Sequence, residues 1–163
     1  MMFKTALIDK TSYLLDTCKR LDISLTTAES CTGGMISALL TEIPGSSASL
    51  HLSYVTYANK AKHAILGVPT DILRDKGAVS EEVVRAMAEG AVIISGASIS
   101  VAVSGIAGPG GGTADKPVGT VHFATHYKNQ TAHDCQHFGD IGRHNVRMAT
   151  VEYAIDMLVK RLN

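Results

Sequence analysis

A tight turn between a β-type run and a helical pattern constrains this chain more than any other stretch. Residues 26–34 read Thr-Thr-Ala-Glu-Ser-Cys-Thr-Gly-Gly, and they overlap a predicted strand over residues 23–27. After the glycine pair, apolar side chains recur at helical spacing as far as Ile43, which predicts a helix there. The pattern therefore places residues 29–32 on a turn between the end of a strand and the start of a helix.

This turn brings two possible nucleophiles, Ser30 and Cys31, to the positive end of a helix. The unpaired N–H groups of a helix start favour negative charge, either on an anion or on the oxyanion of a reaction intermediate. Gly33 and Gly34 leave the backbone bare for the close approach of a ligand. The same residues also suit a structural role, because serine and threonine commonly cap helices. Local sequence leaves open both a reactive site and simple capping by Ser30 or Thr32.

Composition predicts one globular domain over residues 1–163. Hydrophobic residues make up 45% of the chain, and 15 glycines with few aromatic residues favour α/β packing. The formal net charge is zero and no dense run of basic residues occurs, so we expect no nucleic-acid partner. No apolar run is long enough to cross a membrane and the first residues do not read as a signal peptide. We therefore expect a cytoplasmic protein without membrane attachment.

The three cysteines give no sign of a disulfide framework or a cysteine-rich zinc site, because they are scattered and form no CxxC pair. Histidines and a cysteine do alternate on a predicted hairpin: two histidines share one face of its first arm, and two histidines and a cysteine share one face of its second. Such side chains could hold zinc or copper. Histidines on the wet face of an edge hairpin are the commoner situation, so we expect no metal site. The residues concerned are His122, His126, His133, Cys135 and His137.

A strand–helix–strand unit is predicted around the turn. A second strand over residues 51–57 is followed by a helix that begins at Asn59 and carries Lys62. Two strands joined by a helix normally run parallel, so their ends lie on the same side of a sheet. Tyr57 and Lys62 could therefore reach the turn that carries Ser30.

Together with the other patterns in the chain, this unit predicts a three-layer α/β/α sandwich. Its sheet is mixed and mainly parallel, and a C-terminal β-hairpin is followed by a helix. An amphipathic helix over residues 4–21 opens the chain. A helix capped by Ser80 has an apolar stripe that includes Ile94. The remaining predictions are a short helix over residues 70–75, a buried strand over 99–103, hairpin arms over 118–125 and 131–138, and a last helix over 143–161.

A glycine-rich stretch over residues 104–113 follows the predicted strand that ends at Val103. Such a stretch is either an ordered loop whose backbone approaches a ligand closely or a flexible connector. It lacks the Gly-Lys-Ser/Thr ending of a P-loop and the Gly-x-Gly-x-x-Gly spacing of a dinucleotide-binding helix. We therefore expect neither ATP hydrolysis nor NAD as a redox cofactor.

Two arginines stand one turn apart at the start of the last predicted helix. Arg143 and Arg147 could pair with a phosphate group. They could equally form exposed ion pairs with Asp140 and Glu152, which would add little stability.

Taken together, four motifs in the same order closely resemble the CinA C-terminal domain family, and within it the stand-alone nicotinamide-nucleotide amidases of the PncC-like group. The motifs lie at residues 27–34, 55–62, 77–81 and 104–112, the last followed by Lys-Pro-Val-Gly-Thr at 116–120. The resemblance covers essentially the whole chain, which has no room for the additional N-terminal domain of longer members. The family's C-terminal motif, usually Gly-Asp-Arg-x-x-Val/Ile-Arg, departs here, with two extra residues between Asp140 and Arg143.

The resemblance implies hydrolysis of the carboxamide of nicotinamide mononucleotide (NMN), a small-molecule nucleotide, to nicotinic acid mononucleotide and ammonia, without a cofactor. By motif match the nucleophile falls on Ser30 and the base on Lys62, with Tyr57 close to this pair. A homodimer is also expected from the family. Residues implied in holding the oxyanion or substrate are Glu29, Cys31, Thr32, Gly33, Gly34, Asn59, Ser104, Gly105, Gly108, Gly110, Gly111 and Arg143.

The chemistry makes a demand on Lys62, because a lysine acts as a base only when neutral. Lowering its pKa from about 10.4 to near 7 costs roughly 4–5 kcal/mol, and full burial shifts lysines by about 3–5 units. Lys62 is therefore predicted to be buried beside Ser30. Cys31 is the rival nucleophile, since a thiolate at a helix start needs no neutral lysine. The rival function is a non-catalytic nucleotide-binding or regulatory module connected with competence or DNA damage.

Overall fold

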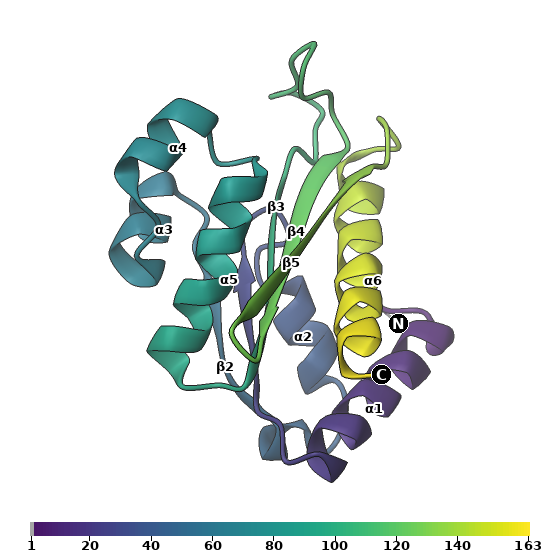
Figure 1. Cartoon of the computed structure of the whole chain (residues 1–163). Helices are drawn as coiled ribbons and strands as arrows, with labels where there is room; N and C mark the ends of the chain where they lie inside the picture. The colour runs from purple at the N-terminus through teal and green to yellow at the C-terminus, as the bar shows by residue number, and fades with distance from the viewer. Residues whose placement is uncertain (1) are drawn as a thin grey trace.

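The computed structural model describes residues 2–163 and shows a five-stranded sheet covered by helices on both faces (Figure 1). The helices are α1 Thr5–Arg20, α2 Met35–Thr41, α3 Asn59–Leu66, α4 Thr70–Lys76, α5 Glu81–Ser95 and α6 Arg143–Leu162. The strands are β1 Leu25–Glu29, β2 Leu50–Val55, β3 Ile99–Gly105, β4 Thr120–Tyr127 and β5 Gln130–His137. A short 3₁₀ turn, Ser46–Ala48, precedes β2.

The sheet has the strand order β2-β1-β3-β4-β5, with β1 parallel to both of its neighbours. β4 runs antiparallel to β3, and β5 antiparallel to β4. The two-residue turn between β4 and β5 consists of Lys128 and Asn129, both with positive φ, as a tight hairpin requires. The predicted three-layer α/β/α sandwich with a mixed sheet and a C-terminal hairpin is confirmed.

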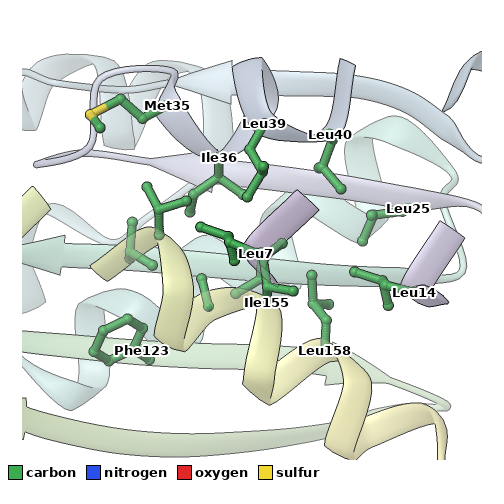
Figure 2. Packing of buried hydrophobic residues seen from close by; sticks show 14 of the residues in the cluster. Leu7, Leu14, Leu25, Met35, Ile36, Leu39, Leu40, Phe123, Ile155 and Leu158 are labelled. Carbon is green, nitrogen blue, oxygen red and sulfur yellow. The ribbon is translucent and has the colours of Figure 1, made fainter. Parts of the chain in front are cut away.

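Each face of the sheet has its own apolar cluster. On one face, side chains of α1, α2 and α6 pack against β1, β3 and β4. Figure 2 shows part of this cluster, where Leu7 and Leu14 lie near Ile155 and Leu158. On the other face, α5 covers small residues of the central strands, and α3 and α4 pack against α5. Each large apolar side chain buried in this way contributes about 1.5–3 kcal/mol, so the layers are held mainly by burial.

Several details differ from the sequence-based expectations. β2 ends at Val55 instead of residue 57, and the first hairpin arm spans Thr120–Tyr127 instead of 118–125. β1 begins at Leu25 and ends at Glu29, two residues later than the predicted 23–27, so Glu29 ends the strand and does not open the turn. A buried glutamate can end a strand here because its carboxylate is fully hydrogen-bonded, as described below. The expected burial of Ile94 is wrong: its side chain is 51% exposed, since α5 runs past the edge of its contact with the sheet.

Close contact between α5 and α3 fixes the helix that carries Lys62. The contact depends on Gly90 of α5, where an added Cβ would lie 1.9 Å from the carbonyl oxygen of Leu66. Because Gly90 has no side chain, the end of α3 packs directly against α5.

Candidate active site

Three parallel strands end together at one edge of the sheet, and the candidate site lies there. Glu29, the last residue of β1, is in register with Val55 of β2 and Val103 of β3. Beyond these positions the Ser30 N–H donates to the Val103 carbonyl, and the Thr56 N–H donates to the Glu29 carbonyl. The segments that follow the three strands are therefore held side by side. In open α/β sheets this is the usual edge for a ligand site.

A pocket of about 190 Å³ opens at this edge. Its polar lining consists of Ser30, Lys62, Ser104, Tyr57 and Arg143, which come from four separate stretches of the chain. Cys31, Gly105 and the apolar residues Ala78, Val79 and Ala107 complete the wall. The pocket thus gathers polar side chains that lie up to 113 residues apart in the sequence, counting from 30 to 143.

Ser30 and Lys62 meet in this pocket. Lys62 Nζ lies 3.0 Å from Ser30 Oγ, and it also donates to the backbone carbonyls of Thr56 at 2.9 Å and Tyr57 at 3.0 Å. Both carbonyls belong to the segment between β2 and α3, so the strand end and the helix start together fix the amine. This arrangement presents one side of Nζ to the serine hydroxyl.

The environment of Lys62 disfavours a charged amine. The side chain is only 1% exposed, and no carboxylate of residues 2–163 lies within 4.0 Å of it. Burial lowers the pKa of Lys62, and a nearby Cys31 thiolate would oppose this change. The direction of the shift is the one that a lysine acting as a base requires.

Cys31 sits next to Ser30 but in a setting that holds its thiol protonated. Burial raises the pKa of Cys31 to about 12, and the charge of Glu29 adds to this effect. The backbone N–H of Cys31 itself and, to a smaller extent, the positive charges of Arg147 and Lys62 lower this pKa without compensating for burial. Cys31 therefore lacks the low pKa that marks a reactive cysteine.

Glu29 occupies the start of α2, where the sequence suggested room for an anion. Its carboxylate is fully buried and accepts hydrogen bonds from the Thr32 hydroxyl at 2.6 Å and from the N–H groups of Gly34, Ile36 and Ser37 at 2.9–3.1 Å. The helix start is thus capped from within by a residue of β1. A ligand anion cannot bind these N–H groups while Glu29 holds them.

The turn itself keeps two N–H groups free. The Gly33 N–H donates to the Ser30 carbonyl, and the Gly34 N–H is taken by Glu29, so neither glycine offers its N–H to a ligand. Within residues 2–163, the N–H groups of Cys31 and Thr32 donate to no other residue. These two groups, and not those of the glycines, remain for an oxyanion.

Arg143 joins the glycine-rich loop to the other side of the pocket. Its guanidinium donates to the Gly108 carbonyl at 2.9 Å and to the Tyr57 hydroxyl at 3.2 Å. The Tyr57 side chain is 62% exposed, so the pair lies at the mouth of the pocket. Asn59, Gly110 and Gly111 are exposed and do not line the pocket.

Arg147 contacts the turn that carries Ser30 but does not line the pocket, a role that its spacing in the sequence did not suggest. It donates to the carbonyls of Cys31 at 3.1 Å and Thr32 at 2.8 Å. Sequence reasoning considered Arg147 only for phosphate or for exposed ion pairs. It also missed Ala78, Val79 and Ala107, whose small apolar side chains carry no chemical signal, and the Thr56 carbonyl, which any residue would provide.

The hairpin histidines lie apart from this pocket. His122 Nδ1 is 3.0 Å from His133 Nε2, and Cys135 Sγ is 3.6 Å from His122 Nε2, so His122 faces its two partners with different nitrogens. His126 instead contacts the Thr131 hydroxyl. Across residues 2–163, no group of three or more His, Cys, Asp or Glu side chains has an arrangement that could hold a metal ion.

None of the helices in the described part of the chain combines the length and the apolar character needed to cross a membrane.

Comparison with known proteins gives consistent results along the whole chain. A family model described as the CinA C-terminal domain matches residues 9–162. The chain is 47% identical over 140 residues to a CinA-like protein of Geobacter sulfurreducens, covering 86% of this chain and 34% of that protein. It is 61% identical over 102 residues to a putative competence-damage inducible protein of Symbiobacterium thermophilum, covering 63% of this chain and 24% of that protein. The chain thus spans about a quarter to a third of the length of these curated relatives.

Solved structures match over nearly their full length. The competence/damage inducible protein CihA of Agrobacterium tumefaciens has a TM-score of 0.95 and 46% identity, with 97% of this chain and 96% of that chain covered. A CinA superfamily protein of Klebsiella pneumoniae has a TM-score of 0.91 and 33% identity, with 96% and 97% covered.

Proposed function

This chain belongs to the CinA C-terminal domain family, and from that premise we propose that it is an amidohydrolase that converts NMN and water to nicotinic acid mononucleotide and ammonia. Ser30 is the nucleophile and Lys62 its general base. Residues 1–163 act in this proposal as one domain, and the reaction needs no cofactor. The names of its relatives do not state this activity, so the proposal depends on the site.

The observation that carries the proposal is the setting of Lys62. A neutral lysine amine has two N–H groups and one lone pair. With the two N–H groups donated to the carbonyls of Thr56 and Tyr57, the lone pair faces Ser30 Oγ at 3.0 Å. Burial without a nearby carboxylate favours this neutral form. An exposed or carboxylate-paired lysine would stay protonated and could not take the serine proton.

In the first half of the reaction, Ser30 Oγ forms a bond to the carboxamide carbon while Lys62 Nζ takes the hydroxyl proton. The carbonyl oxygen becomes an oxyanion, which the free N–H groups of Cys31 and Thr32 stabilise. The C–N bond then breaks, and Lys62 passes the proton to the departing nitrogen, which leaves as ammonia.

The second half removes the ester left on Ser30. Neutral Lys62 takes a proton from water as the water oxygen attacks the ester carbon. The bond between this carbon and Ser30 Oγ breaks, and Lys62 returns the proton to the serine. The carboxylic acid that forms gives its remaining proton to solvent and leaves as a carboxylate.

The size of the pocket supports a ring-sized carboxamide as the bound group. Ligand pockets commonly measure about 300–1,000 Å³, whereas this one measures about 190 Å³. The nicotinamide ring would fill it, and the ribose and phosphate would extend past Tyr57 and Arg143 at its mouth. Arg143 is the basic side chain on that path, which suits a phosphate group.

The test is release of ammonia from NMN by the purified wild-type protein and by Ser30→Ala and Lys62→Ala, all in EDTA. We expect wild-type turnover and a loss of more than about a thousandfold in each variant, since members of such a pair act as a unit. Circular dichroism of each variant is the control for folding.

Turnover that survives in folded Ser30→Ala would refute the serine mechanism. Absence of turnover in folded wild type, together with tight binding of NMN, would instead support a non-catalytic nucleotide-binding module.

A further inference from the structure

Arg147 of α6 reaches the Ser30 turn but does not line the pocket. Its Nε and Nη2 atoms donate to two successive carbonyls, those of Cys31 and Thr32. No carboxylate of the described chain lies within 4.0 Å of this guanidinium. Its positive charge therefore acts on the backbone of the turn and is not neutralised by an ion pair.

The two hydrogen bonds lead to the two free N–H groups of the turn. The Cys31 carbonyl belongs to the same peptide group as the Thr32 N–H, so the bond from Nε polarises that N–H directly. The Thr32 carbonyl shares a peptide group with the Gly33 N–H, which donates to the Ser30 carbonyl at 3.1 Å. The Ser30 carbonyl in turn shares a peptide group with the Cys31 N–H. Each hydrogen-bond chain begins at Arg147 and ends at a free N–H.

Hydrogen bonds in such chains strengthen one another, and a charged donor at the head increases the effect. The planar guanidinium also fixes two carbonyls at once, which an ammonium group on a flexible chain does poorly. Gly33, beside this contact, has a φ of +60°, a backbone conformation that residues with a side chain rarely adopt, while an added Cβ would only touch Arg147 Nη2 at an ordinary 3.5 Å. Substitution by a residue with a side chain would strain the turn next to the arginine.

We propose that Arg147 is a positioning residue of the site, which holds the Ser30 turn and strengthens the Cys31 and Thr32 N–H groups as donors to the oxyanion. This inference rests on the proposed function for its substrate. It differs from phosphate binding, because both carbonyl contacts lie on the turn and Arg147 does not line the pocket.

The experiment compares Arg147→Met and Arg147→Lys with the wild type. Arg161→Met is the matched control, since Arg161 also lies on α6 and donates to a backbone carbonyl, that of Gln130, far from the pocket. We expect Arg147→Met to lower kcat for NMN about 10- to 100-fold with KM within about threefold, because only the transition state carries the oxyanion. Arg147→Lys should recover part of kcat, and Arg161→Met should leave it unchanged.

A second measurement does not depend on the substrate. A small alkyl fluorophosphonate reacts at an activated serine: a bond forms between Ser30 Oγ and phosphorus, fluoride leaves, and Lys62 takes the proton. The rate of labelling of Ser30, followed by mass spectrometry, should fall at least about tenfold in Arg147→Met. Millimolar guanidinium should restore part of the rate in Arg147→Ala but leave Arg161→Ala unaffected.

Equal kcat and equal labelling rates in wild type and folded Arg147→Met would overturn the inference, as would a change in KM alone. The fluorophosphonate could label Ser30 faster in the wild type than in Arg147→Met while the wild type releases no ammonia from NMN. This result would support the role of Arg147 and refute the proposed substrate. Wild type that does not label at Ser30 would overturn both proposals.

Discussion

Burial of the Lys62 side chain opposes folding, but it favours the neutral amine that the proposed reaction requires. An amine shielded from water, without a carboxylate beside it, loses hydration that three hydrogen bonds replace only in part. The loss falls mainly on the charged form, so the pKa decreases. A residue that only stabilised the fold would gain more from an apolar side chain at this position. Perturbed ionisation in a pocket is a common mark of a functional residue.

Substitution of Cys31 tests whether the Cys31 thiol or the Ser30 hydroxyl attacks the carboxamide. We expect Cys31→Ala to keep kcat/KM for NMN within about threefold of wild type, since a thiol with a pKa of about 12 is almost fully protonated near neutral pH. The measurement is ammonia release together with iodoacetamide inactivation. Cys18→Ala is the matched control, because Cys18 is also buried and its pKa is raised to about 11. Loss of activity in Cys31→Ala alone would make cysteine the nucleophile.

The connection from β1 to α2 shows how one element caps the next. Glu29 ends a strand that is buried along its whole length, and its carboxylate accepts the N–H groups that the first turn of a helix leaves unpaired. The strand end, the turn and the helix start therefore form one rigid unit. This unit carries Ser30, and Arg147 donates to the carbonyls of the two residues that follow it, Cys31 and Thr32.

We expect Glu29→Gln to lower the free energy of unfolding by about 3 kcal/mol, because an amide cannot accept all of these donors and turns its NH₂ group toward N–H groups. The same change should slow ammonia release at least about tenfold, since the turn that carries Ser30 loses its support. Urea unfolding and initial rates measure the two effects. Glu42→Gln, at the exposed far end of α2, is the control and should change neither. Equal stability of wild type and Glu29→Gln would contradict this interpretation of the cap.

For the whole molecule, patterns of apolar residues and turn signals predicted the order of elements and the three layers. Parallel pairing of β1 and β2 followed from the helix between them, and it placed Lys62 within reach of Ser30. The sequence could not predict contacts made by backbone groups, such as the Thr56 and Tyr57 carbonyls on Lys62. Nor could it predict that Arg147 meets a turn 115 residues away, or that Glu29 takes the N–H groups that the glycine pair seemed to offer.

The central claim is that a buried, neutral Lys62 activates Ser30, and titration of Lys62 in the folded protein tests it most directly. Carbon-13 NMR of the lysine methylene groups, assigned with Lys62→Met, follows this titration beside the pH profile of kcat/KM. Because burial lowers the pKa of Lys62 and the neutral amine is the base, kcat/KM should rise with pH and level off above that pKa. We predict that both curves share one midpoint below the ordinary pKa of lysine. Lys62 titrating with the exposed lysines, while kcat/KM is already at its plateau near neutral pH, would contradict the account.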